Sequence, residues 1–236
     1  MNGLITLVGS GEYLPVMEDI DRHLLDSLQL NGRKPRVVCL PTAAGREGDA
    51  SVNRWSSMGE EHFQKLGAEV MALPIIDRAS ADDARWEPLL ENADLVYFSG
   101  GDPGYLYQTM KGSRAWEAMQ RACERSAIYA GCSAGAMILG ERMPNFRLTG
   151  TQDGFGLIPA KFIIPHFDAI PAIWKPVVFA LQKQLKKGER MVGVDENTAL
   201  VGRLGEQWTV MGQGNVQIFT CEGKLTFTNG QALTLV

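Results

Sequence analysis

Apolar residues in the first half of the chain fall into short runs that alternate with longer stretches of helical spacing. The first run covers residues 4–8 and predicts a buried strand, and apolar residues then recur three or four positions apart from Ile20 to Leu28. Further apolar runs predict strands over residues 36–40, 69–73, 94–99 and 127–130. Helices are predicted between them, over residues 49–66, 82–91 and 105–125. This alternation is typical of a parallel sheet covered by helices on both faces.

The pattern changes in the second half of the chain. A strand is predicted over residues 161–164, and a helix over residues 171–187 ends before Gly188. Short strands separated by Gly and Asn turns are then predicted over residues 191–195, 199–203, 207–211, 216–220 and 224–228. We therefore expect a C-terminal antiparallel flank beside the parallel sheet. Because no Ser/Gly-rich linker separates the two halves, we expect residues 1–236 to form a single domain.

The composition is that of a globular protein, with 45% hydrophobic residues, 21% charged residues and a formal net charge of −4. Lys and Arg gather only around residues 183–190, which argues against nucleic acid as a partner. No run approaches the ~18 apolar residues of a membrane helix, and residues 1–11 lack the pattern of a signal peptide, so we expect a cytoplasmic protein. The widely spaced cysteines are expected to be free thiols: Cys39, Cys123, Cys132 and Cys221.

The strongest chemical signal is a G-x-S-x-G sequence that directly follows the predicted strand 127–130. A strand that reverses sharply into a helix needs glycine on each side, here Gly131 and Gly135, so that the backbones approach without a Cβ clash. Such a turn exposes the side chain of Ser133, and the start of the helix directs free N–H groups toward it. Ser133 is therefore the candidate nucleophile.

Cys132 is an alternative nucleophile, because thiols are intrinsically more reactive than hydroxyl groups. The spacing argues against it. With Cys132 at the apex of the turn, the flanking positions would be Ala130 and Ala134 in place of two glycines, and the backbones would clash. Cysteine chemistry would indicate an amidotransferase-like amidohydrolase acting on a small metabolite. A third interpretation is a catalytically silent member of the fold that only binds a ligand.

A serine nucleophile needs a base and a group that orients the base. His23 and His62 lie in predicted helices, where we expect surface positions, whereas His166 lies in the loop after the predicted strand 161–164. His166 is therefore the candidate base. The acidic residues that could orient its imidazole are Glu141, Asp153, Asp168, Asp195 and Glu196. Glu196 is favoured, because a carboxylate at a strand end could hold the imidazole in the required tautomer.

Three loops are expected to meet beyond the carboxyl ends of the parallel strands: residues 41–48, residues 100–104 and the G-x-S-x-G turn. The N–H groups of Gly100 and Gly101 are not shielded by side chains, which suits an oxyanion formed by attack on a carbonyl. The N–H of Ala134 is the expected second donor.

Two polar residues of these loops are candidates for substrate binding. Asp102 could accept a hydrogen bond from a substrate amine or cap the following helix, and Arg46 could bind a substrate carboxylate. Gly9-Ser10-Gly11 lacks the third glycine of a dinucleotide-binding fingerprint, and the chain has no H-E-x-x-H or P-loop sequence. We therefore expect no metal and no cofactor.

Four segments, taken in order along nearly the whole chain, resemble the serine peptidase family of dipeptidase E and cyanophycinase. They are Phe98-Ser99-Gly100-Gly101-Asp102, Gly131-Cys132-Ser133-Ala134-Gly135-Ala136, Pro165-His166-Phe167 and Val192-Gly193-Val194-Asp195-Glu196-Asn197-Thr198-Ala199. The resemblance implies a three-layer α/β sandwich with a mostly parallel sheet, flavodoxin-like or class I glutamine amidotransferase-like.

The resemblance also implies roles for individual residues. Ser133 aligns with the family's nucleophile, His166 with its base and Glu196 with the glutamate near the histidine, while Gly101 and Ala134 would form the oxyanion hole. An aspartate between nucleophile and histidine has also been considered in this family, which would be Asp153 here. With Asp168 also in range by sequence, the third position stays open among Glu196, Asp153 and Asp168.

The activity implied is hydrolysis of short peptides at aspartyl dipeptides or β-aspartyl linkages. An acidic substrate group would suit Arg46. The expected partner is a small peptide substrate, and the chain is expected to be a monomer or a homodimer.

Overall fold

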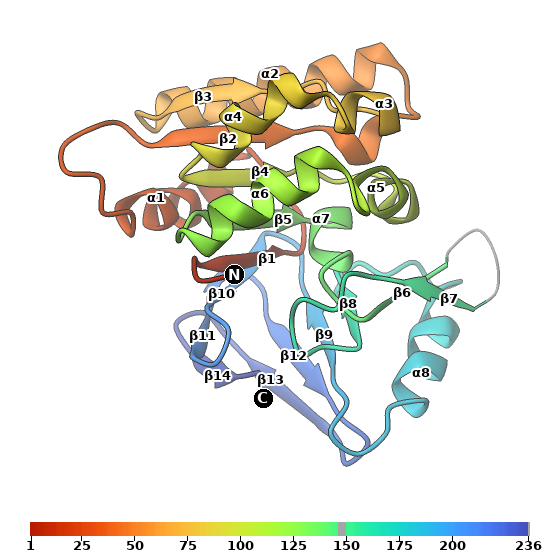
Figure 1. Ribbon diagram of the computed structural model, residues 1–236. Helices are drawn as coiled ribbons and strands as arrows, with labels where there is room; N and C mark the ends of the chain where they lie inside the picture. Colours follow the sequence, from red (N-terminus) through yellow and green to blue (C-terminus); the bar gives the residue numbers. More distant parts are fainter. Residues whose placement is uncertain (146–149, 236) are drawn as a thin grey trace.

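The centre of the protein is an eight-stranded sheet, seen in a computed structural model that describes residues 1–145 and 150–235. The strand order is β14-β11-β10-β1-β5-β4-β2-β3, and in Figure 1 the sheet runs from β3 near the top to β14 near the bottom. The neighbouring parallel strands are β1 (Ile5–Val8), β5 (Ile128–Cys132), β4 (Leu95–Phe98), β2 (Arg36–Leu40) and β3 (Glu69–Ala72). Each coincides with a predicted strand. Every residue of β1, β4 and β5 is buried, which explains why these runs are continuously apolar.

Helices cover both faces of this sheet and confirm the predicted α/β sandwich. The helices are α1 (Glu18–Asp26), α2 (Asp49–Lys65), α3 (Arg78–Ala81), α4 (Glu87–Glu91), α5 (Pro103–Met110), α6 (Arg114–Glu124) and α7 (Ala134–Met137). A further helix, α8 (Lys175–Lys183), packs against a separate, smaller sheet. Leu24 of α1 and Phe63 of α2 share one hydrophobic cluster with Tyr97 of the sheet. Leu106 of α5 and Trp116 of α6 belong to a second cluster on the opposite face. The side chains of successive strand residues therefore enter two different cores.

The predicted antiparallel flank is present, but it is divided between two sheets. One part extends the central sheet beyond β1 with antiparallel strands: β10 (Thr198–Gly202), β11 (Gln207–Gly212) and β14 (Ala232–Thr234). The other part is a separate sheet in the order β13-β12-β9-β8. Its strands are β8 (Phe162–Ile164), β9 (Met191–Val194), β12 (Val216–Phe219) and β13 (Lys224–Phe227). Because β8 and β9 are parallel, their carboxyl ends lie at the same edge.

Some predicted boundaries differ from the structure. The helix expected over residues 171–187 is limited to α8, and only the second part of the stretch 82–91 is α-helical, as α4. The three-residue strands β14, β6 (Arg142–Pro144) and β7 (Thr151–Asp153) were not predicted. The equally short β8 (Phe162–Ile164) was predicted because it is a continuous apolar run, whereas these three segments have neither such a run nor enough positions for a hydrophobic period.

The structure corrects the expected surface position of His62. This side chain is 4% exposed, and its Nε2 lies 2.8 Å from Oδ2 of Asp21, which is also buried. Burial raises the pKa of the Asp21 carboxyl, while the hydrogen bond with His62 opposes that shift. A polar pair therefore lies between α1 and α2, where helix spacing alone could not distinguish an inner from an outer histidine. His23 is exposed, as expected.

The predicted free thiols are confirmed, with Cys39, Cys123 and Cys132 buried and Cys221 exposed. Within the described part of the chain, every helix falls short of the length and apolar character that a membrane crossing needs.

Candidate active site

The G-x-S-x-G turn joins β5 to α7 at the middle of the central sheet. Ser133 has φ 48° and ψ −104°, a backbone conformation that costs a non-glycine residue about 1–3 kcal/mol. A Cβ at Gly131 would lie 2.4 Å from the carbonyl oxygen of Gly135, and a Cβ at Gly135 would lie 2.8 Å from Cβ of Phe98. Both glycines are therefore required, for the reason that the sequence indicated. The Ser133 N–H donates to the carbonyl of Val8 at 2.9 Å, which ties the turn to β1.

The structure brings His166 and Glu196 to Ser133. Nε2 of His166 lies 3.1 Å from Oγ of Ser133, and Nδ1 of His166 lies 2.7 Å from Oε1 of Glu196. His166 and Glu196 each lie two residues beyond the ends of β8 and β9, whose parallel pairing places both side chains at one edge of the second sheet. The three side chains thus form a continuous hydrogen-bonded chain.

The other acidic candidates lie elsewhere. Oδ1 of Asp168 accepts a hydrogen bond from the Glu196 N–H at 2.8 Å, so Asp168 supports the backbone that carries Glu196. Asp153 lies 3.0 Å from Arg142 in the β6–β7 hairpin, and Asp195 is buried, where it accepts hydrogen bonds from Asn215. Glu141 is exposed. Among these carboxylates, only Glu196 is recorded in contact with the His166 ring.

The Gly100-Gly101 turn lies directly beside Ser133. A Cβ at Gly100 would lie 3.3 Å from Cβ of Ser133, and a Cβ at Gly101 would lie 2.5 Å from the backbone of Ala43. Gly101 also has φ 143°, which favours glycine. The Asp102 N–H donates to the carbonyl of Ala43 at 3.0 Å, so the loops expected to converge do meet. For the N–H groups of Gly101 and Ala134, no acceptor is recorded among the described residues.

Glu12 is a residue of this site that the sequence analysis missed. Its side chain is buried, and Oε1 accepts a hydrogen bond from the Gly100 N–H at 2.9 Å. Oε2 accepts a hydrogen bond from the Cys132 thiol at 2.9 Å. Burial, and next the nearby Glu12 carboxylate, raises the pKa of Cys132 well above its usual value, so the thiol stays protonated. The sequence signal that could have identified Glu12 is its position, because it lies in the loop after β1, the strand that pairs with β5.

Two cavities meet at the Gly100-Gly101 turn. One, of about 380 Å³, is lined by Ser133, His166 and Glu196 together with apolar side chains. The other, of about 450 Å³ and called the polar cavity below, is lined by Arg46, Asp102 and three amide side chains together with Gly, Pro and Tyr residues. Gly101 and Pro103 line both cavities, so the two are adjacent.

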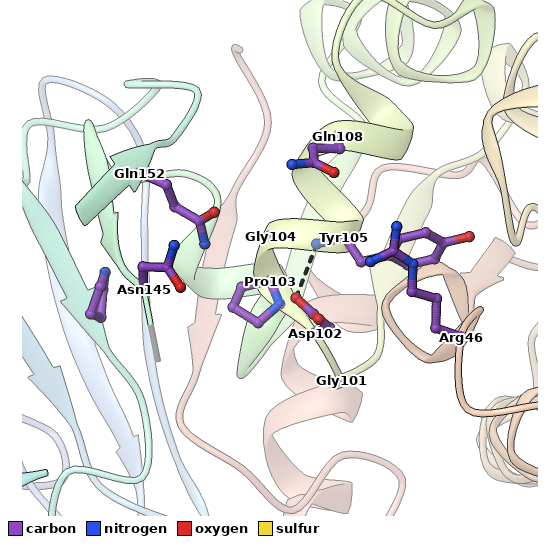
Figure 2. Close-up of a pocket in the computed structure, with 10 residues that line it drawn as sticks. Arg46, Gly101, Asp102, Pro103, Gly104, Tyr105, Gln108, Asn145 and Gln152 are labelled. Carbon is purple, nitrogen blue, oxygen red and sulfur yellow. Dashed lines mark hydrogen bonds between the residues drawn. The ribbon is translucent and has the colours of Figure 1, made fainter. Parts of the chain in front are cut away.

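Figure 2 shows the polar cavity around the start of α5. The guanidinium of Arg46 lies 4.4 Å from the ring centroid of Tyr105, an arrangement that leaves the edge of the planar group available to a carboxylate. Oδ1 of Asp102 accepts a hydrogen bond from the Tyr105 N–H at 3.0 Å, which confirms the capping role considered for this residue. The side chains of Gln108 and Gln152 line the same cavity.

Side chains that could hold a metal ion do not cluster in the part of the chain that the structure describes. No group of three or more His, Cys, Asp and Glu side chains there is arranged to hold an ion. The expectation of chemistry without metal or cofactor stays a prediction.

Comparisons with known proteins identify the family of the chain. A cyanophycinase of Geminocystis herdmanii (strain PCC 6308) is 25% identical over 210 residues, which cover 84% of this chain and 74% of the relative. A cyanophycinase of Synechococcus elongatus is 26% identical over 228 residues, which cover 92% and 67%. The crystal structure of a peptidase from an acI-B1 Actinobacterium matches with a TM-score of 0.89 and 36% identity, over 99% of this chain and 97% of that one.

A putative peptidase E protein from Listeria monocytogenes EGD-e shares the fold, with a TM-score of 0.63 and 20% identity over 91% of this chain and 100% of that one. The model of peptidase family S51 matches residues 5–208, a segment that contains the Ser133 turn, His166 and Glu196. The expected resemblance is thereby confirmed: the chain belongs to peptidase family S51.

Proposed function

We propose that this peptidase hydrolyses short peptides by a serine mechanism in which Ser133 forms an acyl-enzyme. The observation that carries the proposal is the hydrogen-bonded series from Ser133 Oγ to His166 Nε2, and from His166 Nδ1 to Glu196. Nucleophile, base and orienting acid need this order of contacts. The protonated Cys132 thiol is bonded to Glu12 instead, which favours the serine over the cysteine.

Each step then has a group to perform it. Oγ of Ser133 attacks the carbonyl carbon of the scissile bond while Nε2 of His166 takes the hydroxyl proton. As the tetrahedral intermediate collapses, the C–N bond breaks and His166 gives that proton to the leaving amine. Water then attacks the acyl-enzyme while His166 accepts one of its protons. As the second intermediate collapses, the bond to Oγ of Ser133 breaks, His166 returns that proton to Oγ, and the acid product is released. Glu196 stabilises the imidazolium that forms in both halves of the reaction.

The oxyanion of each intermediate would accept hydrogen bonds from the N–H groups of Gly101 and Ala134. Neither group has a recorded acceptor among the described residues, and Ala134 is the first residue of α7. The hydrogen bond from the Gly100 N–H to Glu12 holds the Gly100-Gly101 turn against the Ser133 loop. Glu12 is therefore proposed as a positioning residue for the oxyanion donors.

The polar cavity is the proposed site of the residue that precedes the scissile bond. Arg46 can pair its guanidinium with an acidic side chain, and the carboxylate of Asp102, whose Oδ1 caps α5, can accept a further hydrogen bond from a substrate amine. An N-terminal acidic residue, aspartate or glutamate, carries both groups, and the family resemblance favours aspartate. Cavities of about 380 and 450 Å³ are of the size that holds small ligands, which favours an aspartyl dipeptide or a short β-aspartyl peptide.

Ser133→Ala is expected to abolish reaction with a fluorophosphonate probe and to lower kcat for Asp-Leu by about 10⁴-fold or more, because it removes the hydroxyl that contacts Nε2 of His166. Labelling followed by intact-mass measurement checks the first result, and dipeptide hydrolysis checks the second. Cys132→Ala is the matched control and should still be labelled. Activity that survives Ser133→Ala but is lost in Cys132→Ala would instead support an amidotransferase-like amidohydrolase.

Glu196→Gln is expected to lower kcat by roughly 10³- to 10⁴-fold, because an amide neither fixes the imidazole tautomer nor stabilises its charge. Asp153→Asn is the matched control for the family's alternative acid and should leave kcat within about threefold. Steady-state kinetics on Asp-Leu checks both. The opposite ranking of the two variants would transfer the role of orienting acid to Asp153.

Glu12→Ala is expected to slow fluorophosphonate labelling by about tenfold or more, because the released Gly100-Gly101 turn no longer places an oxyanion donor. Glu12→Gln keeps a carbonyl oxygen for the Gly100 N–H and should label within about threefold of the wild-type rate. Circular dichroism confirms that each variant is folded. Equal labelling rates for wild type and Glu12→Ala would show that Glu12 does not position this turn.

Arg46→Ala is expected to lower kcat/KM for Asp-Leu by roughly 10- to 100-fold, the value of a charge-assisted hydrogen bond, and to leave the slower hydrolysis of Asn-Leu nearly unchanged. Arg54→Ala is the matched control, because Arg54 also stacks on an aromatic ring but lines neither cavity. If Arg46→Ala and Arg54→Ala act alike on Asp-Leu, Arg46 does not bind the acidic group.

A further inference from the structure

The cavity beside Ser133 differs in character from the polar cavity around Arg46. Apart from Ser133, His166 and Glu196, its wall is almost entirely apolar. The side chains that matter here are Met137, Ile164, Ile170, Pro171, Trp174 and Val178. Arg46, Gln108 and Gln152 line the other cavity instead. Among the described residues, a substrate that spans both cavities therefore meets charged and amide groups on one side of Gly101 and an almost entirely apolar wall on the other.

The floor of the apolar cavity is part of a packed core. Ile164 is 2% exposed and Val178 is 8% exposed, and both belong to the hydrophobic cluster between α8 and the second sheet. Ile164 ends β8, two residues before His166, so the same strand positions the floor and the proposed base. A preformed apolar wall of this kind binds an apolar group without first having to order itself.

The position of His166 determines which part of the substrate enters this cavity. In the proposed mechanism Nε2 of His166 must give its proton to the leaving amine, so the nitrogen of the scissile bond has to lie on the His166 side of Ser133. The residue that follows the scissile bond is attached to that nitrogen. His166, Ile170 and Trp174 line the same cavity, whereas the polar cavity lies beyond Gly101.

We infer that the apolar cavity is the subsite for the leaving residue and that it selects a large apolar side chain, such as Leu or Phe. This inference rests on the proposed function and adds the second half of the substrate to it. Among the described residues, the charged or ionisable side chains that line the cavity are His166 and Glu196, which are bonded to each other. An acidic leaving residue would be repelled by Glu196, and a basic one would compete with His166 for that carboxylate.

The expected preference for the leaving residue follows from the free energy of moving apolar groups from water into the cavity. Each fully buried methylene is worth about fourfold in affinity, so the three additional carbons of Leu over Ala predict a kcat/KM for Asp-Leu up to roughly 60-fold above that for Asp-Ala. Asp-Phe should be hydrolysed about as well as Asp-Leu, and Asp-Asp and Asp-Arg less well than Asp-Ala. Kinetics on these five dipeptides, with Ser133→Ala as the blank, measures the preference.

A pair of substitutions on one segment separates recognition from folding. Ile170→Asp places a carboxylate in the cavity and should lower the ratio of kcat/KM for Asp-Leu to kcat/KM for Asp-Ala by about fivefold or more. Ile173→Asp is the matched control: Ile173 is 76% exposed, does not line the cavity, and should leave both substrates unchanged. Damage to the fold would lower both activities together.

Binding is measured separately by isothermal titration of the inactive Ser133→Ala protein with Asp-Leu and Asp-Ala. Tighter binding of Asp-Leu, lost in Ser133→Ala combined with Ile170→Asp, supports the subsite. Ser133-dependent hydrolysis with equal kcat/KM for Leu and Ala overturns the subsite alone. Hydrolysis that survives Ser133→Ala, or no hydrolysis of any dipeptide, overturns the proposed function. In that case the titration alone tests the subsite, and equal affinities for Asp-Leu and Asp-Ala overturn the subsite.

Discussion

The reversal of the chain at Ser133 is the constraint on which the site depends. Gly131 and Gly135 approach so closely that a methyl group at either position would overlap backbone or side-chain atoms. The strained backbone of Ser133 persists because neighbouring strands hold it: its N–H donates to Val8, and the Tyr129 hydroxyl donates to the carbonyl of Gly135 at 2.8 Å. The middle of the parallel sheet thus fixes one hydroxyl group at its carboxyl edge.

The groups around this hydroxyl come from two different sheets. The central sheet contributes Ser133 and the Gly100-Gly101 turn, whereas the second sheet contributes His166 and Glu196 from the ends of β8 and β9. The two cavities follow the same division. The polar one surrounds the start of α5 on the central sheet, and the apolar one is walled by the segment that carries α8. The proposed substrate would lie across the junction, with one residue in each cavity.

The differences between expectation and structure have a common physical origin. His62 and Glu12 are polar residues whose sequence surroundings give no sign of burial, yet each is enclosed when separate elements pack: α1 against α2, and the end of β1 against the Ser133 turn. The division of the antiparallel flank is of the same kind, because strands of similar length and alternation can pair with β1 or with β9. That residues 1–236 form a single domain stays a prediction.

The sequence by itself determined the parallel strands, the helices on their two faces, the glycine-flanked turn and the identity of Ser133, His166 and Glu196 as candidates. Those features depend on local periods and on steric rules that act within a few residues. Only the tertiary structure decided which carboxylate contacts the imidazole, that Glu12 holds the Gly100 N–H, and that a polar and an apolar cavity meet beside Ser133. These contacts join residues far apart in the chain, and the packing of whole sheets and helices sets their distances.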